Sequence, residues 1–77
     1  MGKSIIECVP NISEGRDIEK INRIVDAARI SGVKILGVEP DSDYNRTVIT
    51  FAGNPTDVEH AAFLLIQASI QEIDMSQ

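Results

Sequence analysis

The hydrophobic positions of this chain change their spacing from segment to segment, and each change marks an expected element. Residues 4–9 alternate and predict a strand, which Pro10 ends because proline removes a backbone N–H donor. Apolar residues then recur at helical spacing from an N-cap at Asp17 to the neighbourhood of Ser31, where Gly32 is expected to form a left-handed C-terminal cap. The apolar stripe of this helix consists of Ile18, Ile21, Ile24, Val25 and Ala28.

The second half of the chain predicts an antiparallel pair of strands and a second helix. Residues 33–38 are mostly apolar, residues 46–52 alternate, and the short turn sequence at 40–43 joins them. Asn54 supplies an N-cap and Pro55 the first helical position. The apolar band of this helix is wide, which suggests contacts beyond the chain's own sheet. Its members are Val58, Ala61, Ala62, Leu65, Ser69 and Ile73, flanked by Phe63, Leu64, Ile66 and Ile70.

The order of elements predicts an α+β fold of the ferredoxin-like, split βαβ type. Two helices are expected on one face of a mixed sheet, and a right-handed crossover leaves room for strand 46–52 between the other two. The usual final strand is missing and would flank strand 4–9. We therefore expect the open edge of that strand to be covered by another copy, a companion chain or a missing segment.

Composition narrows the possible functions without choosing one. Seventy-seven residues predict a single small domain, residues 1–77, with a core that supplies only a few kcal/mol and needs support. A formal net charge of −5 without a basic run argues against binding to nucleic acid or an anionic membrane. No stretch is long and apolar enough to span a bilayer, no signal peptide is evident, and Cys8 is the only cysteine. These features predict a cytoplasmic protein.

Four polar residues are expected at one rim of the sheet. Strands 4–9 and 33–38 run parallel and strand 46–52 runs opposite, so the ends of the first two meet the start of the third. Arg46 suits bidentate capture of a substrate carboxylate, Asn11 and Asn45 can donate and accept, and Glu39 can hold a cationic nitrogen or orient a base. The alternative is structural: the asparagines cap turns, and Arg46 pairs with Glu39 or Asp43.

The other chemically interesting residues favour ordinary roles. Cys8 lies between apolar neighbours and is expected to be buried as a small hydrophobic side chain. His60, in the second helix, has no partner in sequence and is expected to face solvent or to be partly packed. Glu39, Asp41 and Asp43 alternate like calcium ligands, but the rest of the EF-hand pattern is absent, so no metal is expected.

Four sequence blocks resemble the motifs of one enzyme family, the glutamate formiminotransferases. Residues 7–16, Glu-Cys-Val-Pro-Asn-Ile-Ser-Glu-Gly-Arg, look like the opening motif of that family. Residues 38–48, Val-Glu-Pro-Asp-Ser-Asp-Tyr-Asn-Arg-Thr-Val, are similar to its second motif in the bacterial form. Residues 50–53 and 73–76 also match, so the resemblance covers nearly the whole chain and corresponds to part of the N-terminal subdomain.

The resemblance implies a transferase of histidine degradation and one-carbon metabolism. Such enzymes move the formimino group of N-formimino-L-glutamate to N5 of tetrahydrofolate, a co-substrate, through a tetrahedral intermediate and with no metal. The resemblance implies a histidine as general acid/base, expected beyond Gln77, so no catalytic residue is assigned in this chain. It implies that Asn11, Asn45 and Arg46 bind substrate together with Glu39, which stands where many members carry aspartate.

Two interpretations of the function remain open from the sequence. In the first, the chain is the N-terminal part of a glutamate formiminotransferase, contributes part of the site and is inactive alone. In the second, it is a non-catalytic ligand-binding or assembly module that keeps the fold. A homo-oligomer or a companion chain is expected to pair at strand 4–9; a companion chain would favour the first interpretation, and a stable oligomer without one the second.

Overall fold

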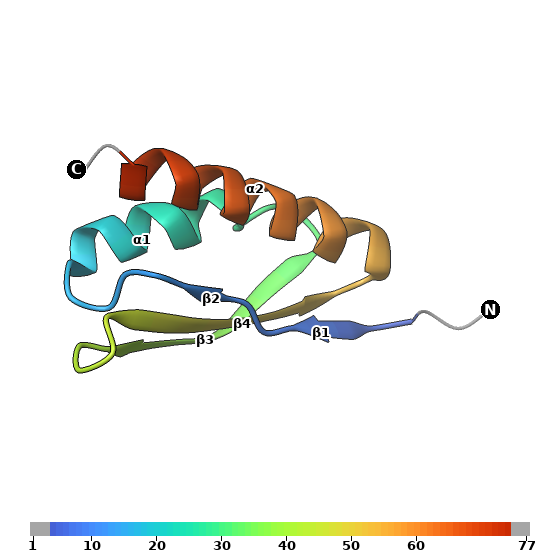
Figure 1. The fold of residues 1–77 in the computed structure, drawn as a ribbon. Helices are drawn as coiled ribbons and strands as arrows, with labels where there is room; N and C mark the ends of the chain where they lie inside the picture. The colour runs from blue at the N-terminus through green and yellow to red at the C-terminus, as the bar shows by residue number, and fades with distance from the viewer. Residues whose placement is uncertain (1–3, 75–77) are drawn as a thin grey trace.

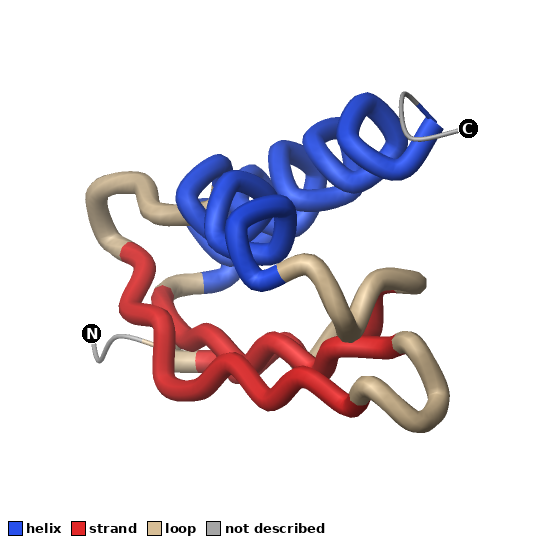
Figure 2. The backbone as a smooth tube through the Cα atoms, turned by 90° about the vertical axis from the view of Figure 1, so that its left-hand side faces the viewer, coloured by secondary structure: helices blue, strands red, loops and turns tan. Residues whose placement is uncertain are grey.

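Strand β4 is the centre of the sheet, because every other strand pairs with it. The computed structural model describes residues 4–74. Figure 1 shows both helices on one face of the sheet, and the turned view of Figure 2 shows the other face open. The elements are β1 (Ile6–Cys8), β2 (Asn11–Ile12), α1 (Ile18–Ala27), β3 (Val33–Asp41), β4 (Arg46–Gly53) and α2 (Pro55–Asp74).

The predicted α+β class is confirmed, with two helices on one face and β4 between the first and second predicted strands. The sheet is antiparallel rather than mixed: β1 and β3 run parallel to each other, but both have β4 as their neighbour, so each ladder is antiparallel. The ferredoxin-like assignment stays a prediction, because residues 4–74 supply no strand on the outer side of β1. The covering of that edge stays a prediction for the same reason.

The first strand ends before Pro10, as predicted: β1 runs from Ile6 to Cys8. What the sequence did not predict is that pairing with β4 resumes directly after the proline, at Asn11. Strands β1 and β2 are two parts of one extended run along β4, and their register is unbroken across the proline: Cys8 faces Phe51, and Asn11 faces Val48. Proline removes a donor but keeps its carbonyl, which accepts a hydrogen bond from Ile49 N at 3.0 Å. The extra residues carry Asn11 onto the sheet itself rather than into a loop.

The core lies between β4 and the two helices, and the predicted alternation of residues 46–52 separates the buried face of β4 from its open face. Thr47, Ile49 and Phe51 are fully buried toward the helices, whereas Val48, Thr50 and Ala52 are partly exposed on the open face. Burial of such apolar side chains is the main favourable contribution to folding. The helices contribute Ile21, Ile24, Val25, Ala28, Val58, Ala61 and Leu65 to this core.

Helix α1 begins as predicted but ends earlier. The side chain of Asp17 accepts a hydrogen bond from Lys20 N at 3.1 Å, so the N-cap is confirmed, although Ile18 at the start of the stripe is exposed. The helix ends at Ala27. Gly32 has the predicted left-handed conformation, with φ 90°, but uses it in the turn that leads into β3.

Helix α2 keeps its predicted N-cap and leaves part of its apolar band uncovered. Asn54 Oδ1 accepts a hydrogen bond from Asp57 N at 2.9 Å. Phe63, Ile66 and Ile70 are 56–62% exposed, so residues 4–74 do not cover this side of the helix. Neither helix, over its described length, is apolar enough to cross a membrane.

Candidate functional site

The four predicted site residues come together at one rim of the sheet. Asn11 of β2 and Glu39 of β3 both pair with Val48 of β4, one from each side, so the three form a row across the open face. The next open-face position of β4 is Arg46, whose backbone lies opposite that of Asp41 in the β3–β4 ladder. Asn45 is the last residue of the turn before β4. The arrangement of strand ends expected from the sequence is therefore confirmed.

A hollow of about 330 Å³ lies on this rim of the open face. Its volume is within the range of pockets that hold small molecules. Asn11 and Arg46 line it, Glu39 lies beside it in the row of Val48, and Asn45 does not line it. The full lining is Asn11, Asp41, Tyr44, Arg46 and Val48.

The guanidinium of Arg46 has no carboxylate partner in the described part of the chain. The alternative pairing with Glu39 or Asp43 is thus not formed. Instead the guanidinium carbon lies 5.9 Å from the centre of the Tyr44 ring, a cation–π distance that leaves its N–H donors free. Sequence analysis missed Tyr44 as a lining residue, because nothing in its local pattern shows that the turn folds back over Arg46.

Asp41 closes the turn between β3 and β4. Its Oδ1 accepts hydrogen bonds from Asp43 N at 3.0 Å and Tyr44 N at 3.3 Å, which is the ordinary turn-closing role of aspartate. The alternation of Glu39, Asp41 and Asp43 therefore reflects the strand and its turn. Across residues 4–74, no group of three or more His, Cys, Asp or Glu side chains is placed to share a metal ion.

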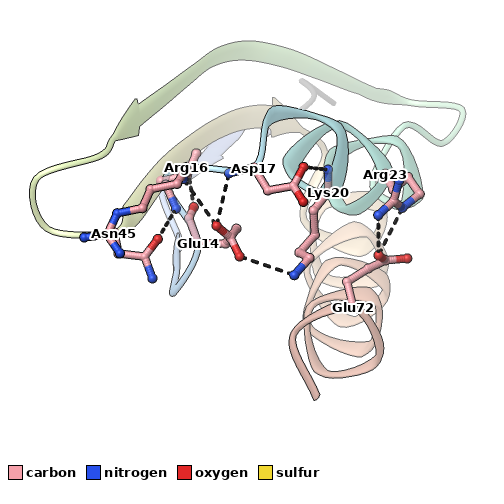
Figure 3. Close-up of polar contacts among 9 residues, drawn as sticks. Glu14, Arg16, Asp17, Lys20, Arg23, Asn45 and Glu72 are labelled. Carbon is pink, nitrogen blue, oxygen red and sulfur yellow. Dashed lines mark hydrogen bonds and ion pairs between the residues drawn. The ribbon is translucent and has the colours of Figure 1, made fainter. Parts of the chain in front are cut away.

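The side-chain oxygen of Asn45, Oδ1, faces the loop before α1 and not the hollow. Its backbone is left-handed, with φ 52°, a conformation that asparagine tolerates better than most residues. Its Oδ1 accepts a hydrogen bond from Gly15 N at 3.0 Å (Figure 3). A turn role for this asparagine is therefore present, and its Oδ1 is engaged with the loop.

The loop of residues 14–16 is held against the β3–β4 turn by further contacts. Arg16 Nε donates to the carbonyl of Ser42 at 2.9 Å, and the hydroxyl of Thr47 donates to the carbonyl of Glu14. Gly15 is buried in this contact. We name this loop, together with its contacts to residues 41–47, the clasp.

The carboxylate of Glu14 anchors the other side of the clasp to α1. It accepts hydrogen bonds from Asp17 N and Arg16 N, both at 3.2 Å, and lies 3.5 Å from Lys20 Nζ. The Asp17 N–H is the main cause that lowers the pKa of Glu14 from 4.5, with Arg16 N–H and Lys20 adding to it and burial opposing it. The carboxylate therefore stays ionised near neutral pH and holds the loop to the start of α1.

Comparison with known proteins gives the family. Residues 5–77 match the family model described as "Formiminotransferase domain, N-terminal subdomain". The chain belongs to this formiminotransferase family. It is 52% identical over 73 residues to the glutamate formimidoyltransferase of Thermoplasma acidophilum, covering 94% of this chain and 24% of that protein. The resemblance indicated by the sequence blocks is confirmed.

Two further relatives show the same extent of similarity. The glutamate formimidoyltransferase of Streptococcus pyogenes serotype M1 is 38% identical, over 95% of this chain and 25% of that protein. The formimidoyltransferase-cyclodeaminase of Sus scrofa is 45% identical, over 95% of this chain and 14% of that protein. The chain thus spans about a quarter of the length of the two single-function relatives and less of the bifunctional one.

In this chain, the two main motif blocks are in direct contact. Block 7–16 supplies β1, β2 and the clasp loop, and block 38–48 supplies the end of β3, the turn and the start of β4. Cys8 is half-buried and packs against the core, consistent with a small hydrophobic role. His60 is exposed on α2, in the layer that covers the opposite face from the hollow, so it does not take part in the rim.

Proposed function

We propose that this chain supplies the glutamate-binding side of a formimino-transfer site. In this proposal it is the N-terminal part of a glutamate formiminotransferase, which moves the formimino group of N-formimino-L-glutamate to tetrahydrofolate in histidine degradation and one-carbon metabolism. The observation that carries the proposal is the hollow on the open face, where Arg46, which has no carboxylate partner within residues 4–74, meets Asn11 at the junction of the two family motifs. The names of the relatives support the reaction class.

The charges of the rim match those of the proposed donor substrate. N-formimino-L-glutamate carries two carboxylates and a basic amidine that is cationic at neutral pH. Arg46 offers paired N–H donors to a carboxylate, and Glu39 offers a carboxylate to the amidinium. These two side chains belong to open-face rows separated by two residues of strand, roughly 7 Å, which is comparable to the length of the substrate.

Asn11 lies at the other end of the row from Glu39, across Val48. Its carboxamide faces the same side of the sheet as Val48 and can donate to a carboxylate or accept from the amidine N–H. Val48 gives the hollow an apolar floor, which lowers the local dielectric and strengthens the charged contacts. In this proposal Asn11, Glu39 and Arg46 bind and orient the substrate.

The transfer itself requires groups that the rim does not provide. N5 of tetrahydrofolate attacks the formimino carbon, a tetrahedral intermediate forms, and the bond from that carbon to the glutamate nitrogen breaks. The proton lost by N5 is returned to the departing glutamate nitrogen, which calls for a general acid/base. Within residues 4–74 the only histidine is His60, on the other layer, so we propose that the acid/base and the folate contacts come from protein outside these residues.

Replacing Arg46 with alanine should weaken binding of N-formimino-L-glutamate about 10- to 100-fold, since a lost charge-assisted hydrogen bond costs about 1.5–3 kcal/mol. Stability should change little because the side chain is exposed. The measurement is isothermal titration calorimetry with the complete formiminotransferase.

Arg29→Ala is the matched control for this variant. Arg29 is also exposed, but it lies beyond the end of α1 and pairs only with Asp26 at 3.1 Å. It should bind the substrate like the wild type. Equal affinities of Arg46→Ala and Arg29→Ala, with transfer activity intact, would remove Arg46 from the binding site.

A further inference from the structure

The clasp gives Asn45 a role that differs from direct ligand binding. Figure 3 shows Glu14 with Asn45 on one side and Lys20 on the other, so the loop is tied to the β3–β4 turn and to α1 at once. Of the side chains in the turn itself, that of Asn45 is the one bonded to the loop, through Oδ1 to Gly15 N at 3.0 Å. The other two ties use the carbonyl of Ser42 and the hydroxyl of Thr47.

We propose that Asn45 is a positioning residue for Arg46, the residue that follows it. Its carboxamide clamps residues 14–16 onto the turn and thereby fixes the backbone from which the Arg46 side chain reaches the hollow. The proposal rests on the proposed function for the role of Arg46 as a substrate-binding residue. The hydrogen bond between Asn45 and Gly15 that restrains the loop is observed within residues 4–74 and does not depend on that function.

The close packing of Gly15 is the physical reason for the coupling. A Cβ built on Gly15 would lie 2.5 Å from Arg46 N and 2.6 Å from Arg46 O, so the loop backbone touches the backbone of Arg46. The conformation of Arg46 is therefore restricted on one side by the loop and on the other by its pairing with Asp41. A fixed backbone lowers the entropy that an exposed arginine must lose when it binds a carboxylate.

Position 45 has a backbone requirement and a side-chain requirement, and different substitutions can remove them separately. The residue must tolerate φ 52° and must place an acceptor oxygen near Gly15 N. Aspartate satisfies both requirements, glycine satisfies only the first, and alanine satisfies neither. If Asn45 instead bound the ligand through its side-chain N–H group, Asn45→Asp would lose that binding, because aspartate has no such donor.

The experiment compares Asn45→Asp, Asn45→Gly and Asn45→Ala by two readouts. The first is hydrogen exchange of the Gly15 amide, measured by NMR. The second is kcat and KM for formimino transfer by the complete enzyme. Loss of the acceptor in Asn45→Gly should speed Gly15 exchange about tenfold and raise KM roughly fivefold with kcat nearly unchanged. Asn45→Ala should show at least these effects, and Asn45→Asp should retain the Gly15 protection.

Ser42→Asp controls for the charge that Asn45→Asp adds to this turn. Ser42 is exposed, and its contribution to the clasp is a backbone carbonyl that the substitution keeps. Asn45→Asp should therefore have the KM of Ser42→Asp. A clearly higher KM than that of Ser42→Asp, with Gly15 still protected, would overturn the proposal in favour of direct ligand binding.

A second result would also overturn the proposal that Asn45 positions Arg46 through its bond to Gly15. If Asn45→Gly kept the protection of Gly15 and the KM of the wild type, only the left-handed backbone would matter at position 45. Failure of the proposed function is distinguishable from either result. It would appear as a wild-type enzyme without formimino transfer. Hydrogen exchange of the Gly15 amide, in contrast, tests the bond to Asn45 without any substrate.

Discussion

Phe51→Ala should lower the free energy of unfolding by about 3–5 kcal/mol, the range measured for removing a buried aromatic side chain. Phe51 is 0% exposed and is the largest fully buried side chain of the central strand, between the β1 and β3 neighbours Cys8 and Ile35. The loss combines the transfer free energy of the ring with the cavity it leaves. Urea denaturation followed by far-UV circular dichroism measures the change.

Phe63→Ala is the control, because Phe63 is 62% exposed on α2. Its free energy of unfolding should stay within about 0.5 kcal/mol of the wild type. If Phe51→Ala does not fold, Phe51→Leu keeps part of the apolar volume and should give a smaller, measurable loss. Equal stabilities of Phe51→Leu, Phe63→Ala and the wild type would contradict the packing of β4 described above.

Gly15→Ala should lower the free energy of unfolding by about 3 kcal/mol, the upper part of the usual cost of overpacking. The added methyl group would meet the backbone of Asp41 and Arg46, which cannot move aside as the end of a flexible side chain can. Gly15 does not have a positive φ, so the cost is steric rather than conformational. Urea denaturation measures this change as well, and Gly15→Ala should also weaken binding of N-formimino-L-glutamate because it displaces Arg46.

Gly37→Ala separates this contact from a general effect of replacing glycine. A Cβ on Gly37, at the irregular register of β3, would have no atom within 4 Å. The substitution should be neutral or stabilise the protein by about 0.4–1 kcal/mol, since alanine lowers the entropy of the unfolded chain. If both substitutions had the same effect, the loop of residues 14–16 would not be packed against the turn.

The layers of the fold were predictable because they depend on local periodicity. The alternation of residues 46–52 placed Ile49 and Phe51 on one face of the strand, which proves to be the buried one, and the Asn54–Pro55 pair placed the start of α2. In each case the signal is carried by neighbouring residues, whose side-chain directions follow from strand or helix geometry.

The errors and omissions came from residues whose role depends on distant parts of the chain. Pro10 was expected to end a strand, and β1 does end before it, but the sequence did not show that the Pro10 carbonyl accepts a hydrogen bond from Ile49 N or that pairing resumes at Asn11. Gly32 was expected to cap the end of α1, but α1 ends at Ala27, and the left-handed Gly32 lies in the turn directly before β3. Local propensity indicates that such residues interrupt a segment, but not where the chain resumes pairing.

The site was predictable as a rim but not as a set of contacts. Strand direction alone brought Asn11, Glu39 and Arg46 together. The bond from Gly15 to Asn45 joins residues 30 positions apart, and no local pattern specifies it. The sequence also did not show that Arg46 lacks a carboxylate partner within residues 4–74, because carboxylates lie close to it in sequence; of these, Asp41 accepts hydrogen bonds from the turn backbone instead.

The most direct test of the account is an NMR titration of the ¹⁵N-labelled enzyme with N-formimino-L-glutamate. The account predicts that the largest chemical-shift changes occur at the amides of Asn11, Glu39 and Arg46, around the hollow of the open face. Changes confined to the helix layer, for example at Leu65 and Ile70, would contradict a binding site on this side of the sheet.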